Sequence, residues 1–549
     1  MKIPVLWRWG LLGLLVVSIL LTVFLVIFLR ESQDLIIVNT PVGSIQGMRA
    51  TNGDYNIFLG IPYAKVNESN PFGASTPYPK FDNVFVANDD TKICPQHQNP
   101  DGPRGVIDCL HLSISVPDSA ASSPLPVMVW IHSGAFERGA TNTFGIKYLV
   151  RHGVIIVSIN YRLGPYGFMC LDIPEVPGNQ GLKDQVLALR WVRDNIEAFG
   201  GDVNKINVFG LSAGGHSIDF HILSDTEILF NSAIIQSGSS MASTVFNNHR
   251  KTAPIDIAAQ LGYNTSSIYK AITYLSTVDS NLVITASRTL NYSYKPCTEI
   301  KFDGVESFLT RHWINADTPK VKGMPILIGY TEQELLMRYV NPNAFTNFNA
   351  IRNRLSETFN FDEVEIAERE ETIRKFYFGD NINITYDQMW EAVHFDSDYT
   401  YVYPTRRTIN KYVASSAESI FFYVFAYYGT RNFHKMSNNV SIGSACHGDD
   451  LGYVFELSLF VEEPTPEDQL ILDRITTMWT NFAKYSDPTP QVSSLLPVRW
   501  PSLTAESYNY MTLTEDMKVG QHPIQERMEF WDIFYEQNKK FEKGFYQNE

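Results

Sequence analysis

One pentapeptide carries the clearest chemical signal in the sequence, Gly210-Leu211-Ser212-Ala213-Gly214. It follows a short apolar run that ends at Phe209 and precedes an apolar stretch over residues 215–223. A serine between two glycines, after a buried strand and before a helix, lies on a sharp turn that exposes its hydroxyl above a sheet. Ser212 is therefore the predicted nucleophile of an acyl-transfer reaction; the alternative is a serine that only caps the following helix.

A nucleophilic serine needs N–H donors for the oxyanion that forms when it attacks a carbonyl. The backbone N–H of Ala213 supplies one donor in this type of turn. A second apolar run ends at Ile131 and continues into His132-Ser133-Gly134-Ala135-Phe136, where small residues leave backbone N–H groups accessible. We assign the other donors to Gly134 and Ala135, although an ordinary strand–helix turn also contains small residues.

The general base is sought among the histidines after Ser212, because in serine hydrolases with this turn the acid and the histidine follow the serine along the chain. Eight histidines qualify: His216, His221, His249, His312, His394, His434, His447 and His522. The first two lie on the predicted helix after the turn and are interpreted as packing or capping residues. His447 follows a strand candidate and precedes a glycine, so a loop can present its imidazole at the carboxyl edge of a sheet. It is the best candidate for the base.

The orienting carboxylate is expected after the strand candidate at residues 325–328, in the segment Gly329-Tyr330-Thr331-Glu332-Gln333-Glu334. Either Glu332 or Glu334 could hold the imidazole in the correct tautomer and stabilise the imidazolium. Spacing alone does not separate the two glutamates.

These side chains must be positioned by an α/β framework. Short apolar runs alternate with helical patterns, which is typical of a parallel sheet covered by helices on both faces. The strand candidates are 127–131, 154–159, 206–209, 233–236, 325–328 and 421–425, and the helix candidates are 183–199, 467–485 and 524–541. The last helix has an apolar stripe that fits either its own core or a second subunit. No linker or internal repeat interrupts the pattern, so one large domain is expected.

Composition excludes several other classes of protein. The 549 residues include 44 basic and 59 acidic side chains, a formal net charge of −15. Such a charge, without a Lys/Arg-rich run, predicts no nucleic-acid partner. A hydrophobic content of 44% allows a large core and argues against disorder. The five cysteines have no zinc-like spacing, so no metal site is predicted.

The amino-terminal segment is less charged than the rest of the chain. Residues 10–29 contain no charge and are long enough as a helix to cross about 30 Å of hydrocarbon. We expect a signal anchor at 10–29 with a cytoplasmic segment at 1–9, a lipid-bilayer contact, and residues 30–549 as a lumenal or extracellular catalytic domain. A cleaved signal peptide and a secreted protein are the alternative. Five Asn-x-Ser/Thr triplets agree with the secretory pathway: Asn67, Asn264, Asn291, Asn383 and Asn439.

Several ordered segments give the chain a family resemblance. They include Phe58 to Ala64, Asp108-Cys109-Leu110, Asn160 to Gly164, Gly178 to Gln185 and Gln236-Ser237-Gly238. On these segments the sequence resembles the type-B carboxylesterase and cholinesterase family of α/β hydrolases, and most of all insect carboxylesterases. The resemblance covers residues 35–534. It implies an α/β-hydrolase fold with a large, mostly parallel central sheet covered by helices on both faces.

The resemblance also implies residue roles. It selects Glu334 as the acid and His447 as the base, and it pairs Cys94 with Cys109 in a disulfide. Cys170, Cys297 and Cys446 would then be free thiols.

One departure from the family lies beside the nucleophile. Leu211 replaces the glutamate that the family usually has before its serine, which removes a negative charge and predicts reduced turnover or a more apolar pocket. The loop between Cys94 and Cys109 contains no aromatic residue, so acetylcholine, which such proteins bind through cation–π contacts, is a poor substrate prediction.

The sequence thus predicts a serine carboxylesterase that needs no metal or organic cofactor. Small-molecule esters are the expected substrates: alkyl or aryl esters, lipophilic hormone esters of the juvenile hormone type, and xenobiotics. A catalytically weak, membrane-anchored adhesion or ligand-sequestering protein is the alternative. The sequence does not determine the oligomeric state.

Overall fold

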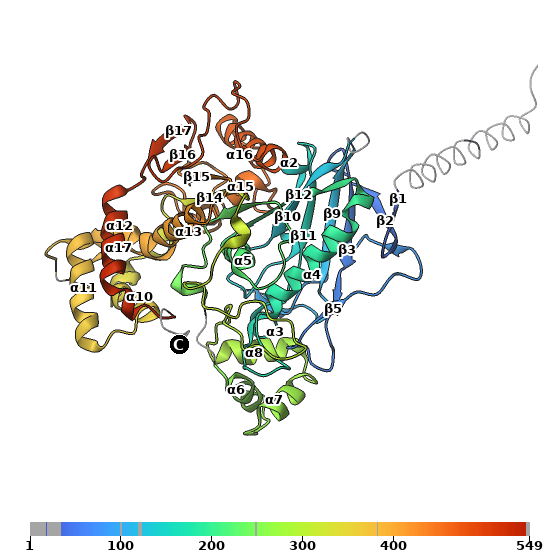
Figure 1. The fold of residues 1–549 in the computed structure, drawn as a ribbon, viewed down its shortest axis with the longest axis horizontal. Helices are drawn as coiled ribbons and strands as arrows, with labels where there is room; N and C mark the ends of the chain where they lie inside the picture. Colours follow the sequence, from blue (N-terminus) through green and yellow to red (C-terminus); the bar gives the residue numbers. More distant parts are fainter. Residues whose placement is uncertain are drawn as a thin grey trace, which may run out of the picture.

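A sheet of 13 strands forms the centre of the protein (Figure 1). The computed structural model describes residue 18 and residues 35–98, 101–118, 123–246, 250–381 and 383–544. Seven neighbouring strands of the sheet are parallel to one another. In spatial order they are β11 (Ile155–Ile159), β10 (Leu125–Ile131), β12 (Gly201–Leu211), β13 (Ser232–Gln236), β14 (Pro325–Thr331), β15 (Ser419–Phe425) and β16 (Asn509–Leu513). The predicted parallel strands form the centre of the sheet, which is mixed as a whole.

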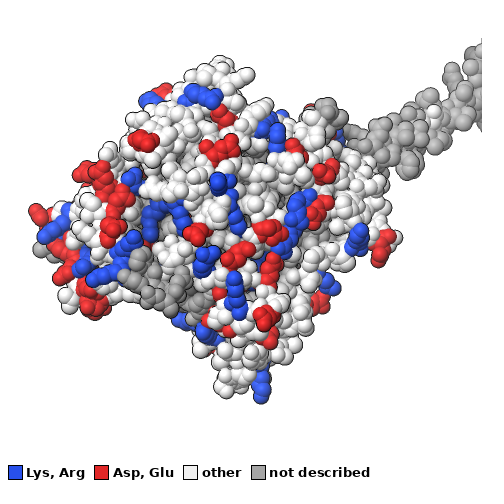
Figure 2. Space-filling view, viewed as in Figure 1, with Lys and Arg blue, Asp and Glu red and all other residues white. Residues whose placement is uncertain are grey.

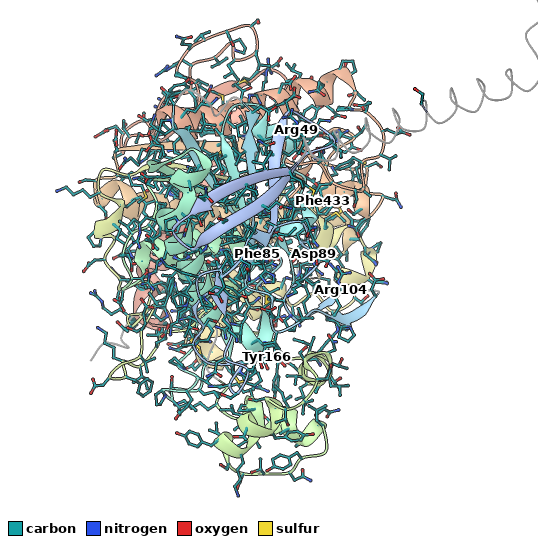
Figure 3. The ribbon with its side chains drawn as sticks, turned by 90° about the vertical axis from the view of Figure 1, so that its right-hand side faces the viewer. Arg49, Phe85, Asp89, Arg104, Tyr166 and Phe433 are labelled. Carbon is teal, nitrogen blue, oxygen red and sulfur yellow. A yellow bond between two sulfur atoms is a disulfide. The ribbon has the colours of Figure 1, made fainter. Side chains whose placement is uncertain are left out.

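Antiparallel strands extend both edges of this parallel centre, and the sequence analysis did not predict them. Beyond β11 lie β9 (His111–Pro117), β3 (Tyr55–Pro62), β2 (Gly43–Arg49) and β1 (Leu35–Thr40), and beyond β16 lies β17 (Lys518–Gln521). The short β6 (Phe85–Val86) pairs with β2. In Figure 3 the β1–β2 hairpin lies across the front of the sheet, with Arg49 at the end of β2. β1 begins with the apolar run 35–38, but only alternate residues face inward, and Leu35 and Ile37 are exposed.

The two faces of the sheet are covered by different helices. Along β10, Val129 and Ile131 belong to one apolar cluster, whereas Met128 and Trp130 belong to the other. Helices α4 (Gln180–Asn195) and α5 (Ala213–Leu223) pack into the first cluster, and α16 (Pro466–Tyr485) packs into the second. Side chains alternate between the faces of a strand, so each face requires its own helical layer. All three predicted helices are present.

The carboxyl-terminal helix α17 (Gln525–Asn538) buries its apolar stripe inside this chain. Met528, Trp531 and Phe534 belong to the first apolar cluster. The ring of Phe530 stacks on Phe376 of α11 (Glu363–Phe378), with ring centroids 4.0 Å apart. In Figure 1, α17 lies beside α10 (Ala350–Thr358) and α11 at the left of the molecule. The stripe therefore contributes to the core of its own chain.

The predicted amino-terminal segments lie outside the described residues. These are residues 1–9 and the membrane segment 10–29, of which only Ser18 is described. In the part of the chain that the structure does describe, no helix is long and apolar enough to cross a membrane.

Two disulfides join distant segments, and one of them corrects the sequence analysis. Cys94 pairs with Cys109, as the family resemblance implied. Cys170 and Cys297, predicted as free thiols, form a second disulfide, and only Cys446 is free. The chain brings the second pair together across 127 residues, a long-range contact that local patterns do not reveal.

Hydrogen bonds from Asn179 hold the segment of Cys297 beside that of Cys170. Asn179 donates to the Cys297 carbonyl at 2.7 Å and accepts from the Cys297 N–H at 2.9 Å. Gly178 has φ +116°, and a β-carbon there would lie 2.3 Å from the Cys170 sulfur and 2.6 Å from the Cys297 sulfur. Only glycine fits beside this bridge.

The asparagines of the Asn-x-Ser/Thr triplets lie at the surface. All five asparagines of the Asn-x-Ser/Thr triplets are exposed: Asn67, Asn264, Asn291, Asn383 and Asn439. On the face drawn in Figure 2, acidic and basic side chains are interspersed.

Candidate active site

Ser212 lies on the turn between β12 and α5, in a strained backbone conformation. Its φ is 54° and its ψ is −118°, which non-glycine residues rarely adopt and which costs about 1–3 kcal/mol. The Ser212 N–H donates to the carbonyl of Gln236 at the end of β13, at 2.9 Å. A β-carbon on Gly214 would lie 2.0 Å from the Ile131 carbonyl oxygen. The close approach of β10, β12 and α5 thus holds the serine on a tight elbow, as predicted.

The loop after β10 presents backbone N–H groups beside this elbow. Gly134, Ala135 and Phe136 all have positive φ, at 116°, 58° and 66°. The carbonyl of Gly134 accepts from the N–H groups of Glu137 and Arg138, at 3.0 and 3.1 Å, which closes the loop. Among the described residues, no acceptor contacts the N–H of Gly134, Ala135 or Ala213. All three predicted oxyanion donors are available for a ligand.

Glu334 and His447 form a close pair at the carboxyl ends of β14 and β15. Oε2 of Glu334 lies 2.6 Å from Nδ1 of His447. Its Oε1 accepts from the hydroxyl of Ser237 at 2.6 Å and from the Thr331 N–H at 2.8 Å. Glu334 is only 1% exposed, whereas Glu332 is exposed. The geometry therefore separates the two glutamates that spacing could not, and Glu334 is the one that contacts the histidine.

The charge environment of His447 favours its protonated form. Burial has the largest single effect and lowers the pKa of His447, but the adjacent Glu334 carboxylate and, to a smaller extent, Asp450 and Asp449 together raise it by more. The net pKa of His447 is raised above its ordinary value. An imidazole in this environment readily accepts a proton from a nearby hydroxyl.

Tyr401 lies in the site beside His447, and the sequence analysis missed it. Its ring lies against the imidazole of His447, with ring centroids 4.6 Å apart, and Ser212 is among the groups that lower the pKa of its phenol. Burial raises the pKa of Tyr401, so the phenol is neutral at physiological pH. Tyr401 belongs to a π-helical turn, Asp398–Val402, and such turns are frequent at functional sites. No sequence pattern marked this turn.

The residue beside the nucleophile makes this side of the site apolar. Leu211 is buried, and its side chain packs against Gly448, the residue after His447. Behind them, Asp450 accepts a hydrogen bond from Gln236 at 2.7 Å. Burial raises the pKa of Asp450 to about 7. Although Leu211 places no carboxylate beside the imidazole of His447, Asp450 is a carboxyl group close to it.

Other histidines near the elbow have structural partners. Nδ1 of His216 contacts the backbone of Ser239, and Nε2 of His221 lies 2.9 Å from Oε1 of Gln185. Both imidazoles are buried, and burial lowers both pKa values to about 3. They pack the helix, as predicted. Within the described ranges, no group of three or more His, Cys, Asp or Glu side chains could hold a metal ion.

The sheet order, the strained serine after β12 and the acid–histidine pair after β14 and β15 define the protein as an α/β hydrolase. Comparison with known proteins agrees. The model of the carboxylesterase family matches residues 34–531, and the chain belongs to this family. It is a carboxylic ester hydrolase.

Individual relatives are similar over nearly their whole length. The chain is 29% identical to a carboxylic ester hydrolase of Bombus ignitus, covering 95% of this chain and 98% of the relative. It is 28% identical to a juvenile hormone esterase of Tribolium castaneum, covering 89% and 91%. The crystal structure of juvenile hormone esterase from Manduca sexta, with OTFP covalently attached, superimposes with a TM-score of 0.78 at 25% identity, covering 92% of this chain and 100% of that one.

Proposed function

We propose that the protein is a serine carboxylesterase in which Ser212, His447 and Glu334 form the catalytic triad. The observation that carries the proposal is the Glu334–His447 contact of 2.6 Å, at the same end of the parallel strands as the strained Ser212. The site lies at the carboxyl ends of the parallel strands, where ligands bind in open α/β sheets.

The proposed mechanism has two half-reactions. Oγ of Ser212 attacks the ester carbonyl while Nε2 of His447 takes the hydroxyl proton. Glu334 keeps the proton on Nδ1 of His447 and stabilises the imidazolium. The N–H groups of Gly134, Ala135 and Ala213 hold the oxyanion. His447 then returns its proton to the leaving alcohol, and a water molecule hydrolyses the acyl-enzyme by the same steps.

The acyl-enzyme step can be tested with 4-nitrophenyl acetate. We expect a burst of one equivalent of nitrophenol per enzyme, followed by steady turnover. Ser212→Ala should abolish the burst and lower kcat by a factor of about 10⁵ to 10⁶. An enzyme without burst or turnover above the Ser212→Ala level would instead support a protein that binds esters without hydrolysing them.

We also propose that this catalytic domain, residues 30–549, folds in the secretory pathway. The two disulfides and the five exposed triplet asparagines support an oxidising, glycosylating compartment. The anchor at residues 10–29 stays a prediction of the sequence. Mass spectrometry of the mature amino terminus tests it, and a start near Glu31 would contradict it.

A further inference from the structure

The loop that carries the oxyanion donors also carries a cation. Arg138 follows Gly134 by one tight turn, because the N–H of Arg138 donates to the Gly134 carbonyl at 3.1 Å. A second cation reaches the same loop from another segment, since Nζ of Lys295 donates to the Ala135 carbonyl at 2.7 Å. The backbone of Arg138 and the ammonium group of Lys295 are thus both held at the loop that carries Gly134 and Ala135.

A cavity of about 550 Å³ opens on this loop. Its walls include Gly134, Ala135 and Arg138, together with Arg288 of helix α8 (Ser280–Thr289) and the segment 291–293. The volume is sufficient for part of a small organic ligand. Gly134 and Ala135 therefore form part of a cavity whose lining includes two guanidinium groups, that of Arg138 on the same loop and that of Arg288 on α8.

The lining of this cavity contains two arginines, Arg138 and Arg288, and one acidic residue. Glu137 is its one acidic lining residue, and burial raises the pKa of Glu137 while Lys295 and Arg288 act against that rise. Arg138 makes no ion pair or side-chain hydrogen bond with any described part of the chain. Its charge reaches His434, whose pKa it helps to lower, and the ring of His434 lies 6.4 Å from that of His447. Arg138 is therefore an exposed guanidinium at the edge of the cavity, without an ion pair to any described residue.

We propose that this cavity is a carboxylate-binding subsite and that the enzyme prefers esters that carry a second, ionised carboxyl group. An arginine guanidinium matches a carboxylate with two parallel hydrogen bonds, and an arginine without an internal partner is free to form them. A neutral ester would offer the Arg138 guanidinium no charged partner. The inference rests on the proposed serine esterase function and names its substrate class.

The test compares pairs of esters that differ only in charge. In the acyl pair, the 4-nitrophenyl monoester of adipic acid is compared with 4-nitrophenyl 6-methylheptanoate, in which an isopropyl group replaces the carboxylate. In the alcohol pair, 4-acetoxybenzoate is compared with 4-isopropylphenyl acetate. We expect kcat/KM to favour the carboxylate in at least one pair by about tenfold or more, the size of a charge-assisted hydrogen bond. Arg138→Gln should remove that preference, and 0.5 M salt should reduce it.

Arg311→Gln is the matched control, because Arg311 is exposed and lies outside the cavity lining. It should leave the preference unchanged. Hydrolysis of the neutral esters without a preference in either pair, or a preference that survives Arg138→Gln, would overturn the subsite and leave the esterase function intact. Calorimetric binding of monomethyl adipate to the Ser212→Ala variant tests the subsite without turnover. Binding that Arg138→Gln abolishes supports the proposal, and no binding contradicts it.

Discussion

Replacing Glu334 by glutamine should disable the base without disturbing the fold. The Oε1 atom of Glu334 accepts hydrogen bonds from Ser237 and Thr331, so a glutamine keeps its carbonyl oxygen on that side. Its amide nitrogen then takes the Oε2 position, 2.6 Å from Nδ1 of His447. Because an amide nitrogen only donates, Nδ1 must become the acceptor, and the imidazole proton moves to Nε2. That tautomer cannot take the proton of Ser212.

The expected loss in kcat is about 10⁴-fold, the typical effect of a wrong tautomer in such a triad, which corresponds to about 5.5 kcal/mol. The assay is kcat and kcat/KM for 4-nitrophenyl acetate between pH 5 and 9. Glu334 raises the pKa of His447, so the acid limb of the remaining activity should move to lower pH in the variant. The melting temperature should stay near that of the wild type, because the bonds from Ser237 and Thr331 remain.

Glu332→Gln provides the control, since Glu332 leaves the same strand end but is exposed. It should keep full activity. The reasoning is refuted if Glu334→Gln retains more than a tenth of the wild-type kcat, or if Glu332→Gln loses as much as Glu334→Gln does.

Three further predictions concern the surroundings of the triad. Asp450→Asn should raise the melting temperature at pH 8 and have no effect near pH 4. The pKa of Asp450 in the folded protein is about 7, above the ordinary 3.8, so the wild type loses up to about 4 kcal/mol of stability as the pH rises from 3.8 to 7. An equal gain in melting temperature at both pH values would contradict this. The same substitution removes a charge that raises the pKa of His447, so the acid limb of kcat/KM should shift to lower pH. Gly214→Ala should prevent formation of the elbow, because its β-carbon would lie 2.0 Å from a carbonyl oxygen of β10, and a soluble, active variant would show that the turn is looser than described. Cys170→Ser with Cys297→Ser should cost about 2–5 kcal/mol of unfolding free energy while the native site stays active, and calorimetry that finds no change would argue against the bridge.

The nucleophile and the central strands could be predicted because their signals are local. The turn around Ser212 depends on two glycines and on an apolar strand before it, all within about ten residues. The parallel strands are buried on both faces, so each is a continuous apolar run in the sequence. Residue pattern alone was sufficient for these elements.

The remaining features depend on contacts between distant segments. Glu332 and Glu334 are two residues apart, and the residue pattern does not show which of them contacts His447. That contact forms only when the segments after β14 and β15 come together in the fold. Tyr401 reaches the site through a π-helical turn that no periodicity marks. The Cys170–Cys297 disulfide joins two segments that are 127 residues apart in the sequence.

The central claim is that Ser212 is the nucleophile, and covalent labelling tests it most directly. The purified protein is treated with the organophosphate paraoxon, digested, and mapped by mass spectrometry. The account predicts one diethylphosphoryl group per chain, on the peptide that contains Ser212, together with loss of esterase activity at the same rate. Active protein without that adduct, or an adduct on another residue that accompanies the loss of activity, would contradict it.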